Sequence, residues 1–253
     1  MEAEKYIQKP TFVTDELKAQ VQAIRPLLIA VFAGLFLLLV SLRVMPVDST
    51  PLLAKVLGLL TPTIAMAGVG AYLGRHIRGW LPLIGLLAAS IIGIFIIQAF
   101  GGSDVAIVLM MGWGVINGMM LGPIVAFAID EAGPQIIIQA LTGTTAVMLL
   151  TGFVALSTGI NFGFLAPYYF LAVIGLVVVG LAGMFFRFSR KSNMLYSVIA
   201  MIVFAGGFLF KFFRLSQSEN TWEQAVQLTI SLYLGFANFF INLLQYLLLS
   251  RRR

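Results

Sequence analysis

The chain has 253 residues, of which 60% are hydrophobic and only 10% are charged, and its formal net charge is +6. Soluble domains carry roughly a quarter charged residues, so this composition excludes an ordinary water-soluble domain and predicts a membrane protein. The chain has no cysteine and only one histidine, His76, which excludes disulfides, iron–sulfur clusters, thiolate zinc sites and histidine-rich metal sites. We therefore expect no cofactor.

The first 25 residues contain both acidic and basic side chains and no apolar core. A signal peptide needs an apolar core and a transit peptide is poor in acids, so neither description fits. We interpret residues 1–25 as a cytosolic N-terminal arm and residues 26–250 as a single transmembrane domain. Residues 251–253 then form a basic C-terminal tail.

Long apolar segments without alternation follow the arm. A membrane-spanning helix needs ~20 apolar residues, and the backbone in lipid must satisfy its own hydrogen bonds. The pattern therefore predicts an all-α, polytopic helical membrane bundle of about eight transmembrane helices. The predicted spans are 26–45, 56–74, 80–99, 105–129, 136–157, 165–186, 194–213 and 226–249. Only residues 101–104 separate the third segment from the fourth. These two segments could be two full spans or one interrupted element.

Lys and Arg are distributed unequally between the two ends of these spans. With an even number of spans, one side holds both chain ends and twelve of the sixteen Lys and Arg residues. The other side holds four, namely Arg43, Lys55, Lys211 and Arg214. Positive charge accumulates in cytosolic loops, so we expect both termini in the cytosol and the protein in a bacterial inner membrane. This asymmetry accounts for the net charge without a nucleic-acid partner.

Small residues recur at helical spacing in two spans. Gly114, Gly118 and Gly122 repeat every four residues in the fourth, and Gly70 and Gly74 do so in the second. Such spacing lets helix backbones approach closely, which favours packing within the chain over a dimer seam. Pro123 is expected to kink or break the fourth span because it lacks a backbone donor.

The last span carries polar or small residues at intervals of 4, 4, 3, 4 and 3, which places them on one helix face: Gln227, Ser231, Gly235, Asn238, Asn242 and Gln245. A polar stripe faces other helices or water, because lipid leaves amides unsatisfied. Two interpretations remain open. The helix is either buried and hydrogen-bonded to its neighbours, or it lines a narrow polar path. We expect this last helix to be central in the bundle.

Lys211 lies near the end of the seventh span, away from the side rich in Lys and Arg. It either snorkels to the interface together with Arg214, or turns inward and donates hydrogen bonds to the polar face of the last helix. No carboxylate is predicted deep in the bundle to pair with it. Asp130 and Glu131 are expected in water at the cytosolic end of the fourth span, on the side of the membrane opposite to Lys211.

Two stretches carry a resemblance to a known family. Residues 112–145 combine a Gly-rich span, a Gly-Pro pair and the element ALTGTT, and residues 208–244 contain FLFKFFRL and SLYLGFANFFINLL. In order and spacing these stretches resemble the Bax inhibitor-1 family, also called the transmembrane BAX inhibitor motif family. The resemblance implies a core of seven spans, one fewer than the eight predicted.

The resemblance also implies a departure at two positions. Family members that leak calcium or sense pH carry an aspartate in each of the last two helices, and the matching positions here are Lys211 and Gly235. A pair of carboxylates attracts a divalent cation, whereas a lone lysine repels it. Calcium conduction by the family mechanism is therefore not expected. Some bacterial members without the aspartates modulate a membrane protease through a cytosolic N-terminal tail, and residues 1–25 fit that use.

Two functions follow as hypotheses. The first is a non-enzymatic integral membrane regulator of the Bax inhibitor-1 type, whose partners are the lipid bilayer and a membrane protease or other membrane protein. The alternative is an ion channel or transporter whose path follows the polar face of the last helix, with Lys211 excluding cations. The sequence lacks a Ser–His pair, paired aspartates and an HExxH motif, which disfavours an intramembrane enzyme.

Overall fold

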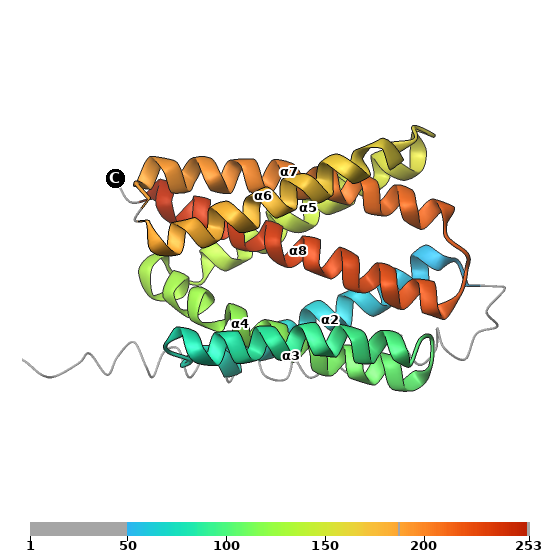
Figure 1. Ribbon diagram of the computed structural model, residues 1–253, viewed down its shortest axis with the longest axis horizontal. Helices are drawn as coiled ribbons and strands as arrows, with labels where there is room; N and C mark the ends of the chain where they lie inside the picture. The colour runs from blue at the N-terminus through green and yellow to red at the C-terminus, as the bar shows by residue number, and fades with distance from the viewer. Residues whose placement is uncertain (1–49, 187, 252–253) are drawn as a thin grey trace, which may run out of the picture. The chain divides into compact units, whose positions relative to one another are not determined.

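The structure is a computed structural model that describes residues 50–186 and 188–251. Its elements in chain order are α2 (Leu52–Gly74), α3 (Trp80–Ala99), α4 (Asp104–Ala132), α5 (Gln135–Ser157), the short 3₁₀ turn η2 (Phe162–Phe164), α6 (Leu165–Phe185), α7 (Arg190–Gln217) and α8 (Trp222–Arg251). Within these residues there is no strand, and seven helices are long and apolar enough to cross a membrane. Figure 1 shows these helices as one bundle, which confirms the predicted fold class.

The seven described helices coincide with the predicted spans from the second to the eighth. The predicted span 26–45, the arm 1–25 and residues 252–253 lie outside the described residues. The uncertain third and fourth segments are two separate helices, α3 and α4. Gly101 turns the chain between them with φ +54°, and the Ser103 side chain accepts a 3.4 Å hydrogen bond from Ala106 N at the start of α4. The interpretation as one interrupted element is therefore wrong.

Glycines join α2 to α4 at backbone contact. A Cβ at Gly114 would lie 2.8 Å from the carbonyl oxygen of Thr63, and one at Gly118 would lie 2.6 Å from the carbonyl carbon of Ala67. Further along, a Cβ at Gly122 would lie 2.7 Å from Arg75 N. Contacting residue numbers rise together, so the two helices run parallel. The predicted packing within the chain is confirmed for Gly114, Gly118 and Gly122.

Gly70 and Gly74 supply the matching surface on α2. A Cβ at Gly70 would overlap the carbonyl group of Val115, and one at Gly74 would lie 2.6 Å from the Cα of Met119. Any larger side chain at these positions would separate the helices, so the small residues are what allows this contact.

Pro123 does not interrupt α4. The helix continues through it to Ala132, so of the predicted kink or break the break is wrong, and the kink stays a prediction. Proline removes one hydrogen-bond donor from the helix, and membrane helices tolerate this where neighbouring groups compensate. Here Gly122, directly before Pro123, lies against the end of α2.

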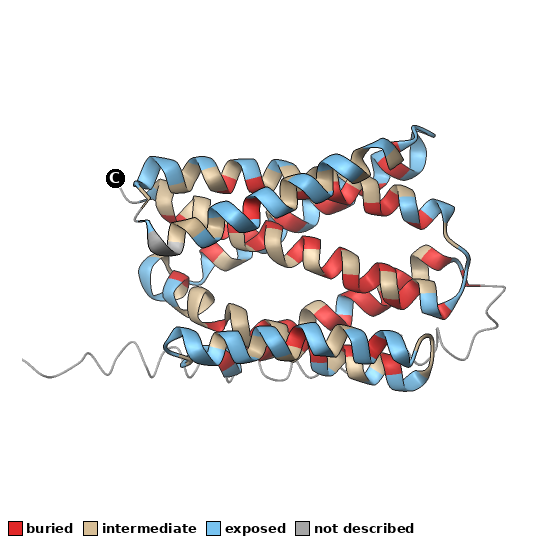
Figure 2. Cartoon of the chain, in the orientation of Figure 1, coloured by how far each residue is buried: buried red, intermediate tan, exposed pale blue. Residues whose placement is uncertain are grey.

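Helix α8 is the central element of the described bundle. It packs against α7, α2, α5, α4 and α3, and every residue from Gln224 to Ser250 is buried or half-buried. By contrast, α6 exposes most of its side chains, as Figure 2 shows by colour. The expectation of a central last helix is confirmed. Surrounding helices keep the polar face of α8 out of lipid.

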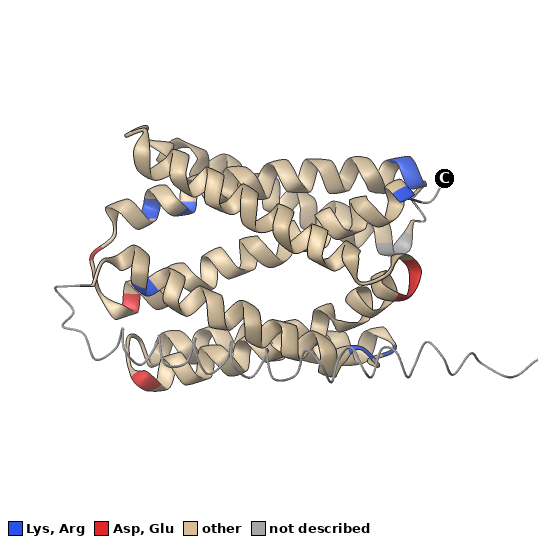
Figure 3. Cartoon of the chain, turned by 180° about the vertical axis from the view of Figure 1, so that it is seen from behind, with Lys and Arg blue, Asp and Glu red and all other residues tan. Residues whose placement is uncertain are grey.

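Charged residues lie near the two ends of the bundle (Figure 3). At one end Arg190 donates to the Leu249 carbonyl at 2.9 Å, and Arg251 donates to the carbonyl of Ala132 and to Gln139. At the other end Lys55 binds Asn220 in the α7–α8 connection. The long apolar stretch between these ends is the part that lipid can cover.

The glycine contact predicts a difference between two substitutions on the same helix. Gly118→Ala should lower the free energy of unfolding by about 1–3 kcal/mol, because the methyl group overlaps the Ala67 backbone. Gly112→Ala, where a Cβ meets no atom within 4 Å, should be neutral or slightly stabilising. Unfolding in detergent micelles, followed by circular dichroism, measures both. Equal stability of the two variants would contradict the proposed role of Gly118.

Candidate functional site

The two positions that the family resemblance matches to aspartates face each other. Lys211 comes from α7 and Gly235 from α8, and a Cβ at Gly235 would lie 2.7 Å from Lys211 Nζ. The Lys211 side chain is only 5% exposed. It therefore turns inward, and the snorkelling interpretation is wrong for this residue. Arg214, one turn later, is exposed.

An aromatic ring lies beside the Lys211 ammonium group. Its Nζ is 5.2 Å from the centroid of the Tyr169 ring of α6. Gly207, one turn before Lys211, makes room for this ring, since a Cβ there would lie 2.9 Å from Tyr169 Cζ. A cation near an aromatic face is stabilised by the ring quadrupole, by about 0.5–2 kcal/mol. This contact offsets only part of the cost of burying a charge.

Within the described part of the chain, Lys211 makes no hydrogen bond and no ion pair with another residue. The predicted donation to the amides of α8 is therefore not formed. The acidic residue of α8, Glu223, precedes Gly235 by 12 positions, or ~18 Å along the helix axis. Asp130 and Glu131 lie at the end of α4 that contacts Arg251, the opposite end of the bundle. Among the described residues, the buried Lys211 ammonium group therefore forms no ion pair with a carboxylate.

The amides on the polar face of α8 bond to their own helix. Asn238 Nδ2 donates to the Leu234 carbonyl at 2.7 Å, and Asn242 Nδ2 donates to the Asn238 carbonyl at 2.8 Å. Gln227 reaches Glu223 at 3.5 Å, and Ser231 is half-buried. The interpretation in which neighbouring helices satisfy these asparagine donors is therefore wrong. Their side-chain oxygens remain available on the face of the helix.

A cavity of about 270 Å³ lies beside this face, and we call it the central cavity. Side chains of α6, α7 and α8 line it: Tyr169, Val173, Leu176, Val177, Tyr196, Phe204, Leu234, Asn238 and Asn242. Asn242 is 7% exposed. Two amides and two phenol groups thus face an otherwise apolar space. Tyr169 also connects this cavity to Lys211, because its ring contacts both.

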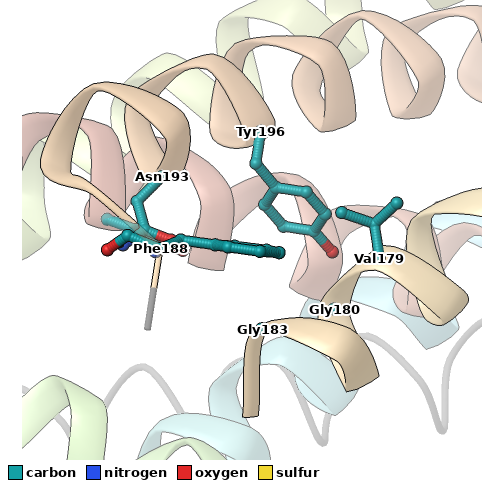
Figure 4. A pocket seen from close by; sticks show the side chains of 7 residues that line it. Val179, Gly180, Gly183, Phe188, Asn193 and Tyr196 are labelled. Carbon is teal, nitrogen blue, oxygen red and sulfur yellow. The ribbon is translucent and has the colours of Figure 1, made fainter. Parts of the chain in front are cut away.

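A second cavity of about 270 Å³, the end cavity, adjoins the first at Tyr196. Its lining comes from α6, α7, α8 and the α6–α7 connection: Val179, Gly180, Gly183, Phe188, Asn193, Tyr196 and Gln245. Figure 4 shows the Tyr196 ring extending from α7 towards Val179 and Gly180. Its hydroxyl donates to the Leu176 carbonyl at 3.1 Å. The C-terminal half of the predicted polar face therefore lines cavities, whereas Gln227 and Ser231 line neither.

One buried cluster was missed by the sequence reasoning. Lys55 is fully buried, donates to the carbonyl and side-chain oxygens of Asn220 at 3.1 and 2.9 Å, and lies 5.4 Å from the Trp222 ring centroid. Asn220 in turn donates to the Thr50 carbonyl at 3.0 Å. The cluster ties the start of α2 to the α7–α8 connection. No local pattern signals it, since Lys55 and Asn220 are 165 positions apart.

The described residues contain no group of three or more His, Cys, Asp or Glu side chains that could hold a metal ion. What the site offers is an ammonium group, two amide oxygens and two phenol rings within a membrane-spanning region. These groups can exclude cations and bind polar groups of a ligand.

Comparisons with known proteins give the family. A family model described as "Inhibitor of apoptosis-promoting Bax1" matches residues 50–253. "Protein LIFEGUARD 4" of Arabidopsis thaliana is 32% identical over 139 residues, 51% of this chain and 56% of the plant protein. An uncharacterized membrane protein of Vibrio cholerae is 30% identical over 193 residues, 75% of this chain and 85% of that protein. A protein of Borreliella burgdorferi is 26% identical over 77% of this chain and 90% of its own.

The buried cation predicts a coupling between Lys211 and Gly235. Lys211→Met should leave stability unchanged or raise it, because an apolar side chain of similar length replaces a buried charge. Gly235→Asp should stabilise the parent protein, in which the flexible lysine can shift and pair with the carboxylate, and destabilise the Lys211→Met variant. Unfolding midpoints of the four proteins should give a coupling energy of at least about 1 kcal/mol. Additive effects would contradict the juxtaposition.

Proposed function

The chain belongs to the family of inhibitors of apoptosis-promoting Bax1, and from this premise we propose that it is a non-enzymatic membrane regulator that does not conduct divalent cations. The observation that carries the second part is the buried Lys211 against Gly235. A divalent cation ~5 Å from the ammonium group would be repelled by roughly 7 kcal/mol at an effective dielectric constant of ~20. No acidic side chain of α7 or α8 near Gly235 offsets that repulsion.

Regulation by contact with other membrane proteins fits a chain whose described residues lie almost entirely in membrane-spanning helices. The described connections between helices are short, so the helix surfaces supply most of the area available to a partner in this part. We place the protein in a bacterial inner membrane with both termini in the cytosol. Bacterial relatives support this placement, as do the basic residues at the end of the bundle that holds Arg251, namely Arg75, Arg78, Arg190 and Lys191. The N-terminal arm, residues 1–25, would then reach a membrane protease from the cytosolic side.

Calcium flux tests the exclusion of cations. Proteoliposomes with the parent protein and an enclosed calcium dye should show no leak above protein-free vesicles. The double substitution Lys211→Asp with Gly235→Asp should raise the leak severalfold, because it removes the ammonium group and places two carboxylates at the juxtaposed positions. A calcium ionophore confirms that the dye responds. A leak in the parent protein that equals the leak of the double variant would refute the proposal.

Degradation of a membrane substrate tests the regulatory part. In bacterial membranes, the full chain should change the half-life of a substrate of the membrane protease at least twofold. A variant without residues 2–25 should lose that effect while its helices still insert. Half-lives come from pulse–chase labelling, with insertion checked by protease protection of the loops. No difference between membranes with and without the full chain would rule this role out.

A second candidate function rests on the two adjoining cavities along α8. Asn238 and Asn242 line the central cavity, and Gln245 lines the end cavity together with Asn193. Tyr169, in the wall of the central cavity, lies beside Lys211. Such a space would suit a polar solute or an anion, for which Lys211 is attractive rather than repulsive. This function requires the cavities to be in contact with water.

Thiol labelling tests that requirement, since the chain contains no cysteine of its own. For a water-filled path, Asn238→Cys and Asn242→Cys should react with a membrane-impermeant reagent in opened membranes. Ser189→Cys in the exposed α6–α7 connection is the positive control. Ile202→Cys, on a surface that is 67% exposed and apolar, is the lipid-facing control. Protection of positions 238 and 242, with labelling at 189, would exclude transport in that state.

A further inference from the structure

We propose that the central cavity binds one neutral lipid with a free hydroxyl group, such as a monoacylglycerol, taken from the surrounding bilayer. The two hydroxyl groups of a monoacylglycerol would donate to the side-chain oxygens of Asn238 and Asn242, and the acyl chain would lie against α6. This inference concerns a ligand site and holds independently of the regulatory function proposed above.

The asparagine oxygens are the first argument. Both amide nitrogens donate to carbonyl groups of α8. Because a carbonyl can only accept, these bonds identify the nitrogen of each amide and leave its Oδ1 as the other atom. In the described part of the chain neither Oδ1 accepts a hydrogen bond, although Asn242 is only 7% exposed. Neither oxygen is fully enclosed by protein, so both acceptors face the cavity and can take a hydrogen bond from a ligand that donates.

The remaining walls suit a hydrocarbon chain. Val173, Leu176 and Leu234 are aliphatic, and Phe204 is aromatic. The end cavity shares the Tyr196 side chain with the central cavity. Gly180 leaves room for that side chain, since a Cβ there would lie 3.1 Å from the Tyr196 hydroxyl. Each of the two cavities has about 270 Å³. Together they reach the size range of ligand sites, ~300–1,000 Å³.

The charges near the two cavities favour a ligand whose hydrogen-bond donor is neutral. No Lys, Arg, Asp or Glu lines either cavity in the described residues. Lys211 lies beside the Tyr169 ring that closes the central cavity, and its charge repels a protonated amine. Two carbonyl-type oxygens in turn disfavour a carboxylate at the same place. A hydroxyl group satisfies both conditions.

The surrounding bilayer is the source of the bound lipid, because part of the cavity wall is also exposed on the lipid-facing surface of α6. Val177 lines the central cavity and is 56% exposed, and Val179 lines the end cavity and is 43% exposed. Both belong to α6, the helix with the fewest buried residues. A lipid can therefore enter between α6 and its neighbours without crossing water.

Binding to the purified full chain in detergent tests the proposal. The probes share one C18 chain: 1-monooleoylglycerol, methyl oleate, oleylamine and oleate. Native mass spectrometry should show one monooleoylglycerol per chain, and the unfolding midpoint should rise with its concentration. Methyl oleate, which lacks a hydroxyl group, and oleylamine, which is cationic, should bind at least about fivefold more weakly, as expected for one lost hydrogen bond or for charge repulsion.

Substitutions locate the site. Asn242→Leu should weaken monooleoylglycerol binding about fivefold or more, whereas Gln227→Leu, on the same face but outside both cavities, should not. Val173→Trp should abolish monooleoylglycerol binding by filling the central cavity. If Asn242→Leu fails to fold, this second variant tests whether the lipid binds there. Equal binding of methyl oleate, or unchanged binding in Val173→Trp, would overturn the proposal. Tighter binding of oleate would indicate a Lys211 anion site instead, and no effect of any lipid would indicate a cavity filled with water.

Discussion

The polar face of α8 has to be kept away from lipid, and the arrangement of the other helices follows from this constraint. Amide groups in hydrocarbon lack hydrogen-bond partners, and each unsatisfied group costs roughly several kcal/mol of free energy. Contacts with α2, α4, α5 and α7 keep most of α8 out of lipid. Asn238 and Asn242 lower the remaining cost by donating to carbonyl groups of α8 itself. The close glycine contact between α2 and α4 lets both helices lie near α8. α6 completes the wall more loosely, and the two cavities lie on that side.

The same central helix sets the chemistry of the site. Gly235 leaves space that Lys211 fills, so a cation occupies the place where the family resemblance puts a pair of acids. By that resemblance, the sign of the buried charge is reversed. A lysine at this place repels calcium, whereas a pair of carboxylates attracts it. This contrast is the physical basis on which we propose contact with proteins or lipids, and not calcium conduction, as the activity.

Periodic features were predictable, and features that depend on distant partners were not. Gly114, Gly118 and Gly122 repeat along one helix, and their packing was inferred correctly because the repeat itself creates a flat surface. The orientation of Lys211 was not predictable, because snorkelling and burial differ only in what lies opposite the side chain. Lys55 and Asn220 show the same limit, since their bond joins chain segments 165 positions apart. Pro123 lies inside the continuous helix α4, so the break that was one of its two expected effects does not occur, and the neighbouring Gly122 lies against the end of α2.

Hydrophobicity, periodicity and charge asymmetry are local properties of the chain, and they determined the membrane-spanning helical class, the spans from 56–74 onwards and the polar face of the last helix. Which neighbours that face meets is a property of the packed bundle. Only the tertiary structure showed that Asn238 and Asn242 bond to their own helix and border a cavity. It also showed that Lys211 meets Gly235 inside the protein. The physical reason is that side-chain direction and desolvation depend on atoms contributed by other helices, which no single segment encodes.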